Sequence, residues 1–116
     1  SNGKNKHKNP MQKLNKAEEF LHSEIVNSTR DGFIKTILEA EDPQYNYLVE
    51  FVRKLKILQL PVPDYLCNLS LAEMEVAKKA QLSQKRWVLH TSIEKLTESQ
   101  EKELALIHFR WHVQYL

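Results

Sequence analysis

Glycine is almost absent from this chain, and this scarcity limits the folds that the chain can adopt. Only two of its 116 residues are glycine, Gly3 and Gly32. Tight two-residue β-hairpins depend on glycine beside asparagine or aspartate, so a fold built of many hairpins has too few turns here. The sequence therefore predicts an all-α fold, a compact bundle of five to six helices.

Two amphipathic helices are predicted in the N-terminal third. Asn9 and Pro10 can serve as the N-cap and first-turn proline of a helix that ends near Asn27. The Asp31-Gly32 pair then interrupts the pattern. A short amphipathic helix is expected to follow over residues 33–38.

The third helix has the clearest pattern. Asp42 and Pro43 can act as its N-cap and first residue. Apolar residues then recur at the spacing of one helix face: Leu48, Phe51, Val52, Leu55 and Leu58. The helix must end before Pro61 and Pro63, because proline lacks the amide proton that a helix interior requires.

Two capping boxes mark the later helix starts. Ser70 can accept a hydrogen bond from the amide three residues on while Glu73 reaches back, and Thr97 with Gln100 repeats the arrangement. We therefore expect a fourth helix to begin at Ser70 and to break near residues 83–85. The last helix should begin near residue 98.

The segment LALIHFRWHVQYL, residues 104–116, admits two interpretations. Apolar and polar residues alternate strictly over residues 107–115, as in a half-buried strand. On a helix the same segment has two opposite apolar faces, one with Leu104, Ile107, Trp111 and Tyr115 and one with Leu106, Phe109, Val113 and Leu116. We favour a helix packed on both sides, because the candidate partner strand RWVLHTSIEKL is joined to it by a stretch without glycine or asparagine. The strand remains the alternative.

A histidine pair in this segment has the spacing of metal ligands on a helix. His108 and His112 lie four residues apart, but a zinc site needs a third and usually a fourth ligand, and nothing nearby supplies them. Phe109 also stands where the H-E-x-x-H motif has its catalytic glutamate. We interpret both as structural histidines and expect no metal and no other cofactor.

Catalytic motifs are lacking as well. The sequence has no P-loop, no dinucleotide-binding glycine pattern and no G-x-S-x-G. Cys67 and His90 could be imagined as nucleophile and base, but the sequence offers no third residue to orient them. We therefore expect that the chain is not an enzyme.

Charge is distributed unevenly along the chain. The net charge is +2, but residues 1–16 carry five lysines and no acid, which leaves 12 basic and 15 acidic residues in the remainder. We expect residues 1–9 to form a disordered basic tail and residues 10–116 a single helical domain. No apolar run approaches the roughly 20 residues of a membrane helix. The single cysteine favours an intracellular protein, in the cytoplasm or nucleus, and the missing initiator Met suggests a segment of a larger one.

The segment EEFLHSEIVNSTRDGFIKTILEAED ends in an acidic link and is followed by YLVEFVRKLKILQLPVPDYL. These two segments resemble the first two helices of the second lobe of the cyclin fold. LSLAEMEVAKKAQL, RWVLHTSIEKL and TESQEKELALI then take the places of the third to fifth helices, although the third is far more charged than in that family. The resemblance implies an all-helical lobe that binds proteins and does not imply kinase activation.

The expected function is that of a non-catalytic protein–protein interaction module in an intracellular regulatory or scaffold protein, with a peptide helix as a possible partner and no membrane contact. Aromatic side chains carry much of the binding energy at such interfaces, and the candidates are Tyr45, Tyr47, Tyr65, Trp87 and Trp111. The alternative is a helical nucleic-acid binder. It would use the basic residues Lys4, Lys6, Lys8, Lys78, Lys79, Lys85 and Arg86.

Overall fold

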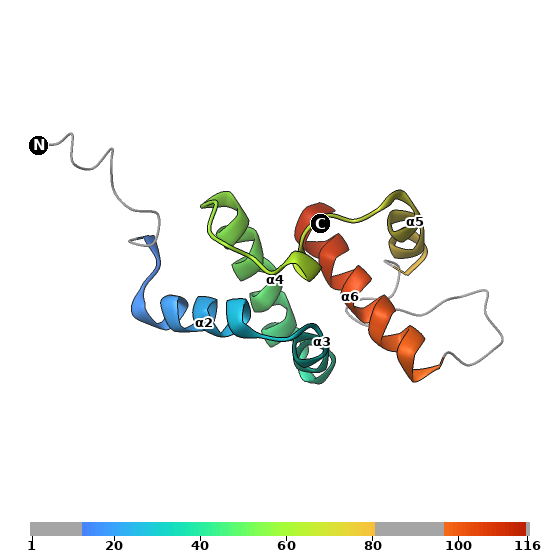
Figure 1. Cartoon of the computed structure of the whole chain (residues 1–116), viewed down its shortest axis with the longest axis horizontal. Coiled ribbons are helices and arrows are strands. Elements are labelled where there is room, and N and C mark those ends of the chain that lie inside the picture. Colours follow the sequence, from blue (N-terminus) through green and yellow to red (C-terminus); the bar gives the residue numbers. More distant parts are fainter. Residues whose placement is uncertain (1–12, 81–96, 116) are drawn as a thin grey trace, which may run out of the picture.

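The computed structural model describes residues 13–80 and 97–115 of the chain. These ranges contain five α-helices and no strand: α2 (Lys16–Asn27), α3 (Arg30–Glu39), α4 (Asp42–Ile57), α5 (Leu71–Ala80) and α6 (Glu98–Tyr115) (Figure 1). A 3₁₀ turn, η2 (Asp64–Leu66), lies between α4 and α5. The prediction of an all-α fold is confirmed. Among the helices described, none combines the length and the apolar character needed to cross a lipid bilayer.

Helix α2 begins at Lys16, later than the start predicted near Pro10, which itself lies outside the described residues. The Asn15 side chain accepts a hydrogen bond from the Glu18 amide at 2.8 Å. In return the Glu18 carboxylate accepts one from the Asn15 amide at 2.9 Å. This capping box fixes the helix start locally, so the N-x-x-E pattern of residues 15–18 is a stronger signal than the earlier asparagine and proline.

The break between α2 and α3 lies at Ser28 and Thr29, whose backbones are extended. The prediction that Asp31-Gly32 forms the break was wrong, because both residues lie in the first turn of α3. The Thr29 hydroxyl caps this turn by accepting a hydrogen bond from the Gly32 amide at 2.9 Å. A Cβ on residue 32 would itself come within 2.9 Å of that hydroxyl, so glycine permits the close approach of the cap.

Helix α4 starts one residue earlier than predicted, with Glu41 as its N-cap in place of Asp42. It ends in a Schellman-type arrangement, in which the Leu60 amide donates to the Leu55 carbonyl at 2.9 Å. Gln59 occupies the left-handed position of this motif, with φ of 61°. The two predicted helix-breaking prolines follow, and the chain passes through η2 towards α5.

Both capping boxes predicted for the later helices are confirmed. The Glu73 amide donates to the Ser70 hydroxyl at 3.1 Å, and the Ser70 amide donates to the Glu73 carboxylate at 2.9 Å. Thr97 and Gln100 make the same pair of bonds, at 3.1 and 2.9 Å. Helix α6 accordingly begins at Glu98, as expected. The break predicted near residues 83–85 lies outside the described residues.

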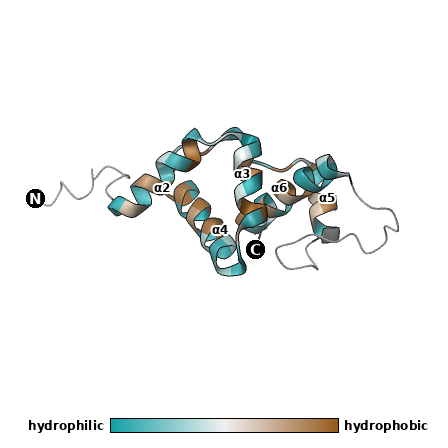
Figure 2. Ribbon diagram, turned by 90° about the horizontal axis from the view of Figure 1, so that it is seen from below, coloured by the Kyte–Doolittle hydropathy of each residue, from teal (hydrophilic) through white to brown (hydrophobic). Residues whose placement is uncertain are grey.

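Helix α6 lies between α5 on one side and α3 and α4 on the other (Figures 1 and 2). One of its faces contributes Phe109 and Val113 to a large apolar cluster with α3 and α4. The opposite face contributes Ile107 and Trp111 to a smaller cluster with Ala77 of α5. The strand alternative for the C-terminal segment is therefore wrong, and the helix packed on both sides is confirmed.

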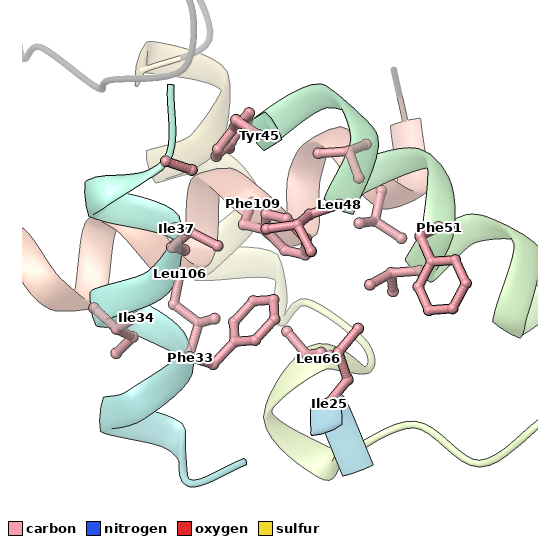
Figure 3. Packing of buried hydrophobic residues seen from close by; sticks show 14 of the residues in the cluster. Ile25, Phe33, Ile34, Ile37, Tyr45, Leu48, Phe51, Leu66, Leu106 and Phe109 are labelled. Atoms are coloured by element: carbon pink, nitrogen blue, oxygen red, sulfur yellow. The ribbon is translucent and has the colours of Figure 1, made fainter. Parts of the chain in front are cut away.

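Phe109 lies at the centre of the larger cluster and is fully buried (Figure 3). Its ring meets Phe33 of α3 edge to face, with 5.1 Å between centroids, and Tyr45 of α4 in the same manner at 5.7 Å. Such edge-to-face pairs add to the stabilisation that comes from burial alone. Ile25 of α2 and Leu66 of η2 extend this cluster, so one core links every described element except α5.

Candidate partner-binding groove

An open groove forms where side chains of α2, the end of α3 and the start of α4 meet. It has a volume of about 660 Å³ and is lined by Leu21, Thr36, Glu39, Ala40, Pro43, Gln44, Tyr47 and Leu48. Ala40 and Leu48 are also members of the large core cluster, so the groove has an apolar floor that the fold itself holds in place. We call this feature the α2–α4 groove.

Tyr47 is the aromatic side chain of this groove that is accessible to a partner. The residue is 54% exposed, although its ring lies parallel to that of Phe51 one turn later, with 6.2 Å between centroids. Phe51 is itself buried in the core. The Tyr47 ring is therefore supported by the fold and exposed to solvent, and such a side chain loses little further conformational entropy on binding.

Two of the other predicted contact residues belong to the core of the domain. Tyr45 is buried, its hydroxyl lies 3.2 Å from Nδ1 of His112, and burial raises the pKa of this phenol. Trp111 is buried in the cluster with Ala77. Neither ring is accessible to a partner, contrary to the prediction, because each fills space between two helices.

Tyr65, the other described aromatic candidate, does not line the groove. Tyr65 is half-buried, and its hydroxyl donates to the Ser28 carbonyl at 3.0 Å, which ties η2 to the end of α2. Trp87 lies outside the described residues. Of the four aromatic candidates that the structure describes, Tyr47 alone lines the groove.

His108 and His112 lie next to each other on α6. His108 is fully buried, and the two imidazole rings lie 4.3 Å apart between centroids. Nδ1 of His112 is 3.0 Å from the His108 carbonyl oxygen. Burial lowers the pKa of His112, the His108 carbonyl opposes this effect, and the nearby Arg53 guanidinium adds to it. Within residues 13–80 and 97–115, no group of three His, Cys, Asp or Glu side chains is placed to hold a metal ion.

Of the candidate nucleophile Cys67 and the candidate base His90, the structure describes only the first. The Cys67 thiol is half-buried and donates to the Pro63 carbonyl at 3.5 Å. His90 lies outside the described ranges.

The basic residues of the nucleic-acid alternative are mostly outside the described ranges as well. Lys78 is exposed, and its ammonium lies 3.6 Å from the Glu75 carboxylate on the same helix. The Lys79 side chain and the residues Lys4, Lys6, Lys8, Lys85 and Arg86 are not described. The structure therefore assembles no basic patch from these residues in the part that it describes, and nucleic-acid binding stays a prediction.

Comparison with known proteins yields no relative. No protein-family model, no curated protein and no solved structure matches this chain. The resemblance to the second cyclin lobe consequently stays a prediction, and the α2–α4 groove is the feature on which a function can be argued.

Proposed function

We propose that this chain is a non-catalytic protein interaction module that holds an amphipathic helix of a partner protein in the α2–α4 groove. The observation that carries the proposal is the exposed, supported ring of Tyr47 beside an apolar floor. Helix-in-groove recognition places apolar side chains at positions i, i+3, i+4 and i+7 into such a surface.

The open shape of the groove favours a peptide over a small molecule. Small-molecule sites bury about 70–90% of their ligand, which requires an enclosed cavity. A helix needs only one apolar face covered, and its other face can remain in water. The exposed aromatic side chain at the groove is also typical of the residues that dominate binding energy at protein interfaces.

The cellular setting that we propose is supported by the sequence alone. We place the module in an intracellular regulatory or scaffold protein, and the resemblance to the second cyclin lobe supports the same class of function. In such a module the packed helices supply a rigid binding surface and do not catalyse a reaction.

The test compares two exposed apolar residues on the same helix. The immobilised 116-residue chain, its Tyr47→Ser variant and its Ile57→Ser variant are each used to capture proteins from a cell extract. Ile57 is 79% exposed but lies ten residues further along α4, roughly 15 Å away along the helix axis. We expect proteins bound by the wild-type chain to be reduced at least about tenfold by Tyr47→Ser and retained by Ile57→Ser.

Far-UV circular dichroism and a urea midpoint close to wild type would verify that both variants fold. Loss of capture in Ile57→Ser with retention in Tyr47→Ser would place the interface at the other end of α4 and contradict the proposal. Equal capture by all three chains would contradict it as well.

A further inference from the structure

The rim of the α2–α4 groove carries charge of one sign. Glu39 lines the groove directly, and Glu41 and Asp42 lie between the lining residues Ala40 and Pro43. Residues 36–48, which supply all the groove side chains of α3 and α4, contain these three acids and no lysine or arginine. The basic residue next to this stretch, Lys35, leaves the acids in excess.

Helix polarity adds to the negative potential at Glu39. This residue ends α3, where the unpaired carbonyl groups give the helix its partial negative charge. A basic side chain in the last turn would offset that charge, but the last turn of α3 has none. A carboxylate at this position is locally unfavourable, and a cation bound in the groove would relieve it.

Two cations of α4 bind groups of the described part of the chain other than Glu39 and Glu41. Lys54 of α4 approaches α2 closely, but its ammonium pairs with Glu18 at 2.8 Å. Arg53 donates to the carbonyls of His112 and Val113 at the end of α6. Glu39 and Glu41 have no ion pair with a described residue.

We propose that the partner helix bound in this groove is cationic, with lysine or arginine residues flanking its apolar stripe. The inference rests on the function proposed above and adds the charge of the partner to it. The apolar stripe covers Tyr47 and the groove floor, while the flanking cations face Glu39 and the acidic link between α3 and α4. Charge of this kind at a rim selects the partner and speeds association more than it adds affinity.

A selection experiment tests the charge without knowledge of the natural partner. A display library of amphipathic helical peptides, with the apolar positions varied among Leu, Ile, Phe and Met and the flanking positions among Lys, Gln and Glu, is selected on the immobilised 116-residue chain. Selection on the Tyr47→Ser chain provides the background. We expect lysine to be enriched over glutamate at flanking positions, in peptides that the variant does not retain.

The failure of the inference and the failure of the proposed function give different results. Enrichment of glutamate, or no charge preference among peptides that depend on Tyr47, would overturn the cationic partner and leave the groove as the binding site. Absence of any peptide that distinguishes the wild-type chain from Tyr47→Ser would overturn the proposed function itself.

Two charge-reversal variants then test whether the charge preference depends on the acids beside the groove. Glu39→Lys should weaken a selected lysine-rich peptide by about threefold to tenfold at low salt, and added salt should reduce the difference. Glu75→Lys changes the net charge equally but lies on α5, on the far side of α6 (Figure 1). It should change the affinity less than about twofold. If both variants weakened peptide binding equally, net charge alone would explain the change in affinity, and the inference would be overturned.

Two other occupants of the groove would be recognised by their own measurements. A second copy of the chain would appear as self-association in analytical ultracentrifugation that Tyr47→Ser abolishes. The basic N-terminal segment of the chain itself would appear as peptide affinity that rises when residues 1–9 are deleted. Either result would overturn the proposal that a separate cationic partner occupies the groove.

Discussion

The two faces of helix α6 enter clusters that differ in size among the described residues. The cluster with α3 and α4 contains 17 buried residues of the described ranges, with Phe109 at its centre and aromatic rings meeting edge to face. The cluster with α5 contains three buried residues of the described part, Ala77, Ile107 and Trp111. Among the described residues, the same helix thus has one face in a large apolar cluster and the other in a smaller one.

Polar contacts supplement the smaller cluster. The Arg110 guanidinium donates to the Asn68 carbonyl at 3.1 Å and to the Glu73 carboxylate at 2.9 Å. One turn later, the Gln114 amide donates to the Cys67 carbonyl at 2.8 Å. Among the described residues the large cluster buries more apolar side chains, so we expect it to supply more of the stability and α5 to detach locally before the rest of the domain.

Alanine substitution of Phe109 and of Trp111 is expected to show that the two clusters differ in stability. Phe109→Ala should lower the free energy of unfolding of the whole domain by about 3 to 5 kcal/mol, because the cavity lies among three helices. Trp111→Ala should lower the free energy of unfolding by a smaller amount. Once α5 is released from α6, the variant can lose no more than the free energy that holds α5 in place. Urea denaturation measures the first effect, and amide hydrogen exchange measures the second helix by helix.

The exchange pattern is the decisive measurement. In Trp111→Ala, protection should fall in α5 and remain close to wild type in α3 and α4. Equal loss of protection in all three helices would mean that the two clusters unfold as one unit, and the proposed difference between them would be wrong.

An ion pair between Arg110 of α6 and Glu73 of α5 joins the two helices. Arg110 is 10% exposed at its side chain and Glu73 31%, and Nε of Arg110 has no hydrogen-bond partner in the described part of the chain. Glu73→Gln should therefore destabilise the docking of α5 by about 1 to 3 kcal/mol, because a nearly buried guanidinium loses its counter-charge. Hydrogen exchange in α5 measures the loss.

The matched control is Glu75→Gln on the same helix. Glu75 is exposed and pairs with Lys78 at 3.6 Å, so its neutralisation should change stability by less than about 0.5 kcal/mol.

Lowering the pH should have the same effect on α5 as Glu73→Gln. Burial raises the pKa of Glu73, but hydrogen bonds from Ser70 and Arg110 outweigh burial and hold it below the ordinary value of 4.5. The ion-pair stability is thus present above pH 4.5 and is lost as the pH falls through the lower folded-state pKa.

Features that depend on neighbouring residues could be predicted from the sequence. The starts of α5 and α6 are examples, because Ser70 with Glu73 and Thr97 with Gln100 form their capping bonds within four residues. The two opposite faces of α6 were also predictable, since they follow from helical periodicity alone. The start of α2 could have been predicted by the same local rule, applied to Asn15 and Glu18.

Features that depend on tertiary packing could not be predicted. Tyr45 and Tyr47 are two residues apart and chemically identical, yet one is buried between helices and the other is 54% exposed. The groove joins Leu21 of α2 to residues of α3 and α4, and no sequence spacing encodes that meeting. The full burial of His108 depends likewise on helices that approach from distant parts of the chain.

The smallest expected effect lies at the boundary between α4 and α6 and involves His112. Its imidazole lies between the Tyr45 hydroxyl and the His108 carbonyl, and Arg53 binds the carbonyl of His112 itself. Burial, with the Arg53 charge, holds the pKa of His112 below the ordinary value of 6.5. The unfolded chain therefore takes up this proton first as the pH falls, so stability begins to decrease near pH 6.5 and stops decreasing below the folded-state pKa.

The measurement separates His112 from the carboxylates by its pH window. The free energy of unfolding should decrease modestly between pH 7.5 and 5.5, above the range in which Glu73 is protonated, and His112→Gln should reduce this decrease. An NMR titration of the imidazole resonances assigns the change to His112 directly. A folded-state pKa at or above the ordinary value would contradict the prediction, because it would mean that the Tyr45 and His108 contacts stabilise the imidazolium more than burial and Arg53 destabilise it. The large cluster would then be the acid-resistant face of α6, and loss of stability on acidification would begin with the ion pair of Glu73 on the α5 side.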